Sequence, residues 1–157
     1  MTDLILFAHP VLGVLGILAA LWVIVETLNT SQKNTWRIRL ASIAVTLFIC
    51  GAWVLGGYWY VHFYAPEKDV ILKGPWPWAH NIVMESKEHL FFIPLVLAFY
   101  LPIVASGRLT RSRATRVMVI TVAFLILASG LVIEGGGALI NYGVKVAFLH
   151  TGGTGVE

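Results

Sequence analysis

The sequence predicts an all-α integral membrane protein, a bundle of four helices with both chain ends on the same side of the bilayer. Three observations predict this class. The 157 residues are 58% hydrophobic and 12% charged. The apolar residues gather in four long runs, and the arginines are confined to two short segments between those runs. Runs of about 20 apolar residues are long enough to cross the hydrocarbon core as helices.

The expected spans cover residues 4–28, 38–64, 89–106 and 117–148, which form a single transmembrane domain over residues 1–157. Backbone groups in lipid must be satisfied within their own segment, so each run is expected to be helical. The segment 65–87 contains Gly74-Pro75-Trp76-Pro77-Trp78, and proline interrupts a continuous helix. We therefore expect it to fold back as a lid loop over the outer end of the bundle.

The arginines set the expected orientation. All six lie in or beside the segments 29–39 and 107–116, and an excess of positive charge marks the cytoplasmic loops of membrane proteins. With four spans, both termini and the lid then face outward, N-out and C-out, in the inner (cytoplasmic) membrane of a bacterium or archaeon. Because the basic residues flank membrane helices, no nucleic-acid partner is expected.

All the histidines lie at the opposite end of the spans from the arginines. They are His9, His62, His80, His89 and His150. At 1.5 Å per helical residue, His9, His89 and the carboxylate of Glu134 lie about 27–30 Å from the arginine-bearing loops, and His62 about 36 Å unless its helix tilts. Imidazole in a lipid-embedded segment needs a partner, so several at one depth indicate a bound haem or metal near the outer face.

Haem b is the expected cofactor, because it requires axial imidazoles, an apolar slot and a polar rim for its propionates. The candidate ligands are His9, His62 and His89, and which two of them serve is open. Glycines along the helices are expected to make room for the flat macrocycle. The residues expected at the rim are Lys87, Trp76 and Tyr60. The sequence has no Cys-x-x-Cys-His motif, which excludes covalent attachment of haem.

This arrangement resembles small four-helix membrane b-type cytochromes, in architecture over the whole chain and without a signature motif. The resemblance implies electron transport between quinone and an extracytoplasmic redox partner, as a redox subunit of a quinol-linked oxidoreductase with other membrane or periplasmic subunits. Glu134 and Glu85 would then either support the cofactor ligands or accept the protons that quinol releases. Many such cytochromes carry two histidines on one helix for two stacked haems. No helix here offers that pair, so one haem is expected.

Two alternatives stay open. Imidazole with carboxylate also suits a bare zinc, copper or iron ion, held by His9, His62, His89 and a glutamate. The chain can instead be a non-redox anchoring or assembly subunit of a larger membrane complex, with no cofactor of its own. In that case the histidines would be interface residues or quinone contacts.

Overall fold

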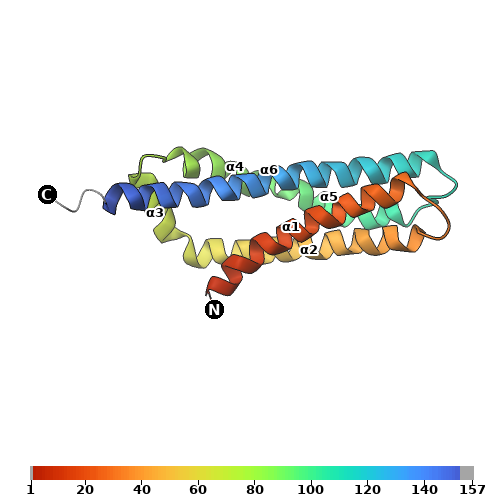
Figure 1. Cartoon of the computed structure of the whole chain (residues 1–157), viewed down its shortest axis with the longest axis horizontal. Helices are drawn as coiled ribbons and strands as arrows, with labels where there is room; N and C mark the ends of the chain where they lie inside the picture. The colour runs from red at the N-terminus through yellow and green to blue at the C-terminus, as the bar shows by residue number, and fades with distance from the viewer. Residues whose placement is uncertain (1, 153–157) are drawn as a thin grey trace.

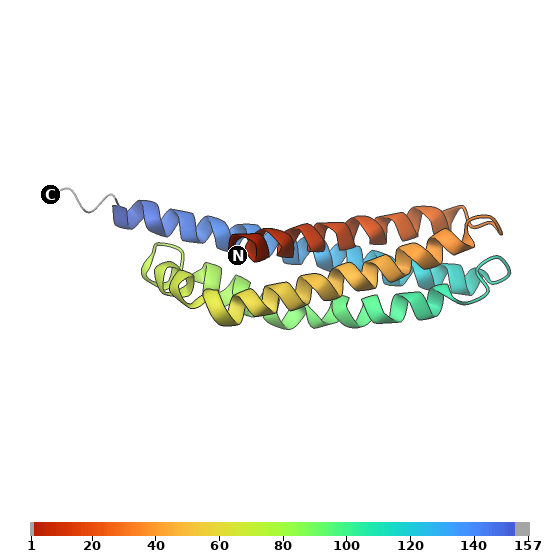
Figure 2. The same ribbon diagram turned by 90° about the horizontal axis from the view of Figure 1, so that it is seen from below.

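The computed structural model of the chain describes residues 2–152, which form an elongated helical bundle (Figures 1 and 2). The elements in order are α1 (Thr2–Leu28), α2 (Thr35–Phe63), α3 (Ala65–Lys73), the π-helix η1 (Ala79–Met84), α4 (Glu85–Leu90), α5 (Phe92–Ala105) and α6 (Arg113–Gly152). The predicted all-α class is confirmed.

Within the described residues, four helical segments are long and apolar enough to cross a membrane. They are Leu4–Leu28, Thr35–Phe63, Ala79–Ala105 and Arg113–His150. Their outer faces carry large exposed hydrophobic side chains, such as Leu47 and Val132 with exposed fractions of 66% and 64%. Such surface suggests a lipid bilayer as the surroundings.

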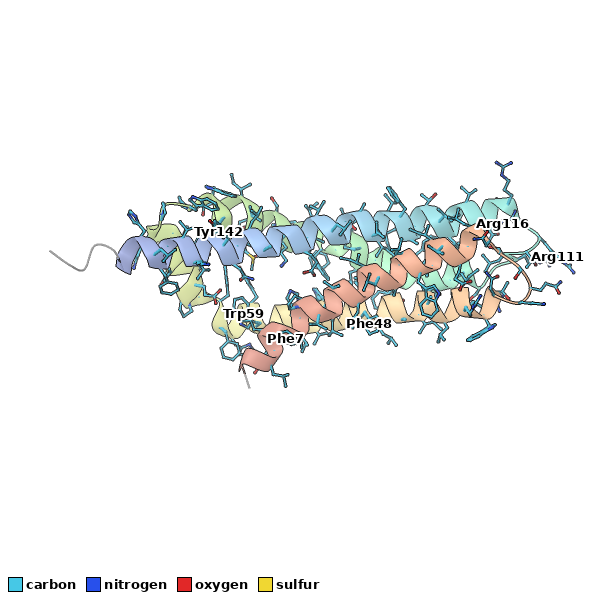
Figure 3. The ribbon with its side chains drawn as sticks, in the orientation of Figure 1. Phe7, Phe48, Trp59, Arg111, Arg116 and Tyr142 are labelled. Carbon is cyan, nitrogen blue, oxygen red and sulfur yellow. The ribbon has the colours of Figure 1, made fainter. Side chains whose placement is uncertain are left out.

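Figure 3 distinguishes the two ends of the bundle. Arg111 and Arg116 lie at the end where the connections 29–34 and 106–112 join the helices, which we call the arginine end. Trp59 and Tyr142 lie toward the opposite end, which we call the histidine end. In Figure 1, α6 extends beyond the start of α1 at the histidine end.

The helices pack closely in the half of the bundle toward the arginine end. Small residues supply much of that core, and five of them are fully buried: Ala20, Ala41, Ala98, Ala105 and Ala123. Small side chains let helix backbones approach one another, which increases dispersion contacts in lipid. A separate core cluster lies at the histidine end, around Tyr64, Ile71, Ala79, Met84 and Ile140.

The segment 65–87 is mostly helical, although we expected a loop. Pro66 lies in the first turn of α3. Backbone N–H groups in the first turn of a helix have no acceptor within the helix, so proline is tolerated there. Residues 74–78, with two prolines, then end α3, and the chain re-enters helix as η1 and α4. Both α3 and η1 contact α6. The predicted break is therefore real, but it is confined to about one turn.

Candidate functional site

A cavity of about 390 Å³ lies at the histidine end, between α1, α2, α6 and the segment that includes α4 and the start of α5. Its apolar walls include Trp53, Trp59, Phe91, Phe92 and Ile140. Its polar side chains include His9, Tyr60, Lys87, Glu88, Glu134 and Asn141. Mostly apolar walls with a few polar groups are typical of sites that bind small molecules.

His9 is held in one tautomer. Its Nδ1 lies 2.8 Å from the carbonyl oxygen of Ala52 on α2. Because a carbonyl can only accept, Nδ1 carries a hydrogen, and in the neutral ring Nε2 then has the lone pair. Among the described residues, Nε2 has no hydrogen-bond partner. The ring packs against Gly56, where an added Cβ would lie 2.5 Å from the Cε1 atom of His9.

Two charged side chains are positioned in the same way, each against a glycine of another helix. The carboxylate of Glu134 on α6 packs against Gly13 of α1, one helical turn beyond His9, and a Cβ at residue 13 would overlap with it. The Lys87 ammonium lies 3.0 Å from the position of a Cβ at Gly137. The charges of Lys87 and Glu134 interact electrostatically across the cavity wall. These glycines thus make room for polar side chains, where we expected room for a macrocycle.

Aromatic and acidic groups line the cavity where α2 meets α3. Tyr60 and Tyr64 stack with ring centroids 5.1 Å apart. Burial raises the pKa of Tyr64 above its ordinary value, so its hydroxyl stays protonated. Burial also raises the pKa of Glu67. The Oε1 atom of Glu88 is buried without a hydrogen-bond partner among residues 4–150, although the Glu88 carboxyl group interacts with the Tyr60 hydroxyl.

Half of the residues that the sequence predicted for the site line this cavity: His9, Tyr60, Lys87 and Glu134. The others lie outside its lining. His62 and His89 are exposed, and the Nδ1 of each bonds to a carbonyl one turn back in the chain, Tyr58 at 2.9 Å and Glu85 at 2.7 Å.

Trp76 packs instead with Trp78 and Tyr142, at centroid distances of 5.1 and 5.2 Å. Glu85 faces His80, with 3.7 Å between Oε1 and Nε2. Across the described part of the chain, no group of three or more His, Cys, Asp or Glu side chains is arranged to hold a metal ion. The structure therefore does not bring His9, His62 and His89 together, and their joint role as ligands stays a prediction.

Residues that the sequence did not single out complete the lining, among them Tyr64, Glu88 and Asn141. Two of them could have been found by looking for residues four or seven positions from a predicted site residue, on the same face of its helix. Asn141 follows Glu134 by seven residues, and Tyr64 follows Tyr60 by four, so each pair shares a face of its helix or of its continuation. His80 lies outside this lining, beyond the break at residues 74–78.

The cavity combines an imidazole acceptor, a carboxylate, an ammonium group and phenol hydroxyls within apolar walls. Such a set can bind a polar headgroup on an apolar molecule and can accept protons from it. Comparisons with protein-family models, curated proteins and solved structures find no match to this chain.

Proposed function

We propose that this chain is a membrane-embedded redox subunit that binds a quinone in the cavity and exchanges electrons with an extracytoplasmic partner. The hydrogen bond between His9 Nδ1 and the Ala52 carbonyl, at 2.8 Å, carries the proposal. In the neutral imidazole, this bond leaves the Nε2 lone pair available in the cavity lining. That nitrogen is suited to accept a hydrogen bond from a quinol hydroxyl.

The composition of the cavity supports a quinone over a more polar ligand. A quinone is a flat apolar ring with two oxygens, and the aromatic walls around Trp53, Trp59 and Phe91 can cover such a ring. His9 and Glu134 come from different helices and both line the cavity, so we expect each to meet a different quinone oxygen. The surrounding helices present apolar outer faces, where an isoprenoid tail would stay in lipid.

The proposed reaction balances in protons and electrons. Oxidation of a quinol to a quinone releases two protons and two electrons. His9 Nε2 would accept the proton of one hydroxyl and the Glu134 carboxylate that of the other, while Lys87 supplies a positive charge beside that carboxylate. The electrons would leave singly to a one-electron acceptor carried by the partner protein.

The distribution of arginine supports the orientation. Both arginine-bearing connections lie at one end of the bundle, and the positive-inside tendency assigns that end to the cytoplasm. The cavity would then lie near the outer face of an inner membrane, with N-out and C-out termini. A periplasmic or membrane-bound redox subunit could approach it from that side.

Photoaffinity labelling with an azido-quinone tests the proposal on the full chain in nanodiscs. Label should appear in peptides that contain cavity residues of α2, α4 and α6, and excess decylubiquinone should remove it. His9→Leu should reduce this labelling strongly. His62→Leu is the matched control, because His62 is exposed and lies outside the lining. Label spread over the apolar faces without competition would contradict a quinone site.

Haem b is the second candidate, with His9 as the imidazole that this chain supplies. Histidines that bind metal commonly bond through their other ring nitrogen to a backbone carbonyl, as His9 does with Ala52. A bound haem would supply one-electron redox chemistry, and Lys87 would pair with a propionate.

An absorption spectrum before and after dithionite distinguishes the candidates. A sharp Soret band with reduced α and β bands would establish haem. His9→Ala should then abolish the bands, whereas His62→Ala and His89→Ala should keep them. A flat spectrum together with competed quinone labelling would support quinone alone. If the protein binds neither, an anchoring or assembly role is the function that remains.

A further inference from the structure

His80 is a buried polar residue that the proposed quinone site does not use. Its exposed fraction is 2%, although it lies only two residues beyond the break at residues 74–78. It belongs to the π-helix η1, which contacts α3, α4 and α6. π-Helical turns are rare and often occur at functional positions.

Both ring nitrogens of His80 face polar groups. Nδ1 lies 3.0 Å from the Tyr64 hydroxyl, and Nε2 lies 3.7 Å from Glu85 Oε1. The Glu85 carboxylate can only accept, which favours the ring hydrogen on Nε2, and in that tautomer Nδ1 accepts from the Tyr64 hydroxyl. The distance of 3.7 Å is longer than a hydrogen bond but within reach of an ion pair or of one bridging water.

The three side chains connect the cavity with the surface. Tyr64 lines the cavity, the His80 side chain is 3% exposed, and the Glu85 side chain is 51% exposed. The charged and titratable groups around Tyr64 are Tyr60, Glu67, Glu85 and Glu88. Three of these four are carboxyl groups, and their negative charge would stabilise a proton passing through His80.

We propose that Tyr64, His80 and Glu85 form a proton path from the quinone cavity to the surface at the histidine end. This inference rests on the proposed oxidation of quinol. After His9 or Glu134 has taken a proton from quinol, that proton passes within the cavity to the Tyr64 oxygen while the proton of Tyr64 moves to His80 Nδ1. The Nε2 proton of the imidazolium then leaves to the Glu85 carboxylate and on to water. Rotation of the imidazole ring restores the starting tautomer.

Protein-film voltammetry of nanodisc protein loaded with decylubiquinone tests the path, because the electrode replaces the unknown electron acceptor. The rate of proton-coupled quinol oxidation is compared among His80→Gln, Tyr64→Phe and Glu85→Gln. Glutamine at residue 80 can still accept from Tyr64 but cannot relay a proton. We expect His80→Gln and Tyr64→Phe to slow oxidation by at least about tenfold and Glu85→Gln by less. Decylubiquinone affinity, measured by titration, should stay within about twofold in His80→Gln and Glu85→Gln.

His89→Leu is the matched control, since His89 is exposed and bonds to the backbone of its own helical segment. It should oxidise quinol at the wild-type rate. Wild-type rates in all three path variants, with quinone affinity retained, would overturn the proton path and leave the quinone site intact. Absence of decylubiquinone binding by the wild-type protein would instead overturn the proposed function.

Discussion

The position of His9 depends on Gly56, because the imidazole occupies space that a Cβ at residue 56 would fill. A Cβ there would lie 2.5 Å from Cε1 and 2.7 Å from Nδ1. Real Cβ contacts are longer, so the ring would have to move. The ring is also fixed by its bond to Ala52, and moving it would break that bond.

Gly56→Ala should therefore weaken quinone binding without unfolding the bundle. Loss of one hydrogen bond and of the fixed tautomer should raise the Kd about fivefold to tenfold. Titration of nanodisc protein with decylubiquinone, followed by quenching of tryptophan fluorescence, measures the change. Gly135→Ala is the control, because a Cβ there would meet no atom of the described residues within 4 Å. Equal affinities in the two variants would contradict the role of Gly56.

A second prediction concerns Glu67, whose pKa is raised by burial. A carboxyl group with a higher pKa in the folded state retains its proton longer there, so stability falls as pH rises through the interval above the unfolded value of 4.5. Glu67→Gln should remove this cost. The variant should unfold at a higher temperature than wild type at pH 7.5 and at the same temperature at pH 4.

Thermal unfolding in detergent, followed by circular dichroism at both pH values, measures this difference. Asp69→Asn is the control on α3, because Asp69 is exposed. The interpretation fails if the stabilisation by Glu67→Gln is equally large at pH 4.

The sequence indicates how far along its helix each polar residue lies from the arginine end. It does not indicate toward which side of the helix the side chain points. Counting residues from the arginine-bearing segments placed His9, His89 and Glu134 at nearly one level. The structure directs His9 and Glu134 into the cavity, whereas His89 lies outside its lining. The direction of a side chain around the helix axis depends on which helix faces pack together. A span that is apolar on all sides has no polar face in its sequence, so the packed face cannot be identified from it.

At the level of elements, the four apolar runs were predictable because hydropathy alone requires helices in lipid. The break at residues 74–78 was also predictable from its prolines. The helices α3 and η1 on either side of the break could not be predicted. They are short, so their stability depends on packing against α6. Their placement buries His80, so the proposed proton path depends on packing that the sequence does not show.

Arg39 fixes the C-terminal end of α5. Its Nε donates to the Ala105 carbonyl at 3.3 Å, and its terminal NH₂ nitrogen donates to the Ser106 carbonyl at 3.2 Å. The last carbonyls of a helix lack intrahelical donors, so these bonds join α2 to the end of α5.

Arg39→Ala should lower the unfolding temperature in detergent by about 2–4 °C, which corresponds to about 1 kcal/mol for a chain of this size. Quinone affinity should not change, because the site lies at the other end. Arg39→Lys should recover only part of the loss, since an ammonium group lacks the planar fork that reaches both carbonyls. A full recovery by lysine would mean that charge alone matters at this position.

On the scale of the whole molecule, α6 is too long to lie entirely within a bilayer. Its 40 residues span about 60 Å, twice the roughly 30 Å of the hydrocarbon core. In a bilayer, part of α6 would therefore project beyond the hydrocarbon core, together with α3 and η1, which pack on it. The cluster of Trp76, Trp78 and Tyr142 suits that level, where aromatic side chains meet lipid headgroups.

The orientation of the bundle decides which partners can reach the cavity. Cys50 is the only cysteine of the chain, so a Cys50→Ser background allows single cysteines to report the side of each end. Gln32→Cys marks the arginine end and Asp69→Cys the histidine end, and both positions are exposed. In intact spheroplasts, a membrane-impermeant maleimide should label residue 69 directly and residue 32 only after permeabilisation. The reverse pattern would place the cavity and the exit of the proton path toward the cytoplasm. An electron partner would then have to be cytoplasmic, and proton release would no longer contribute to a gradient across the membrane.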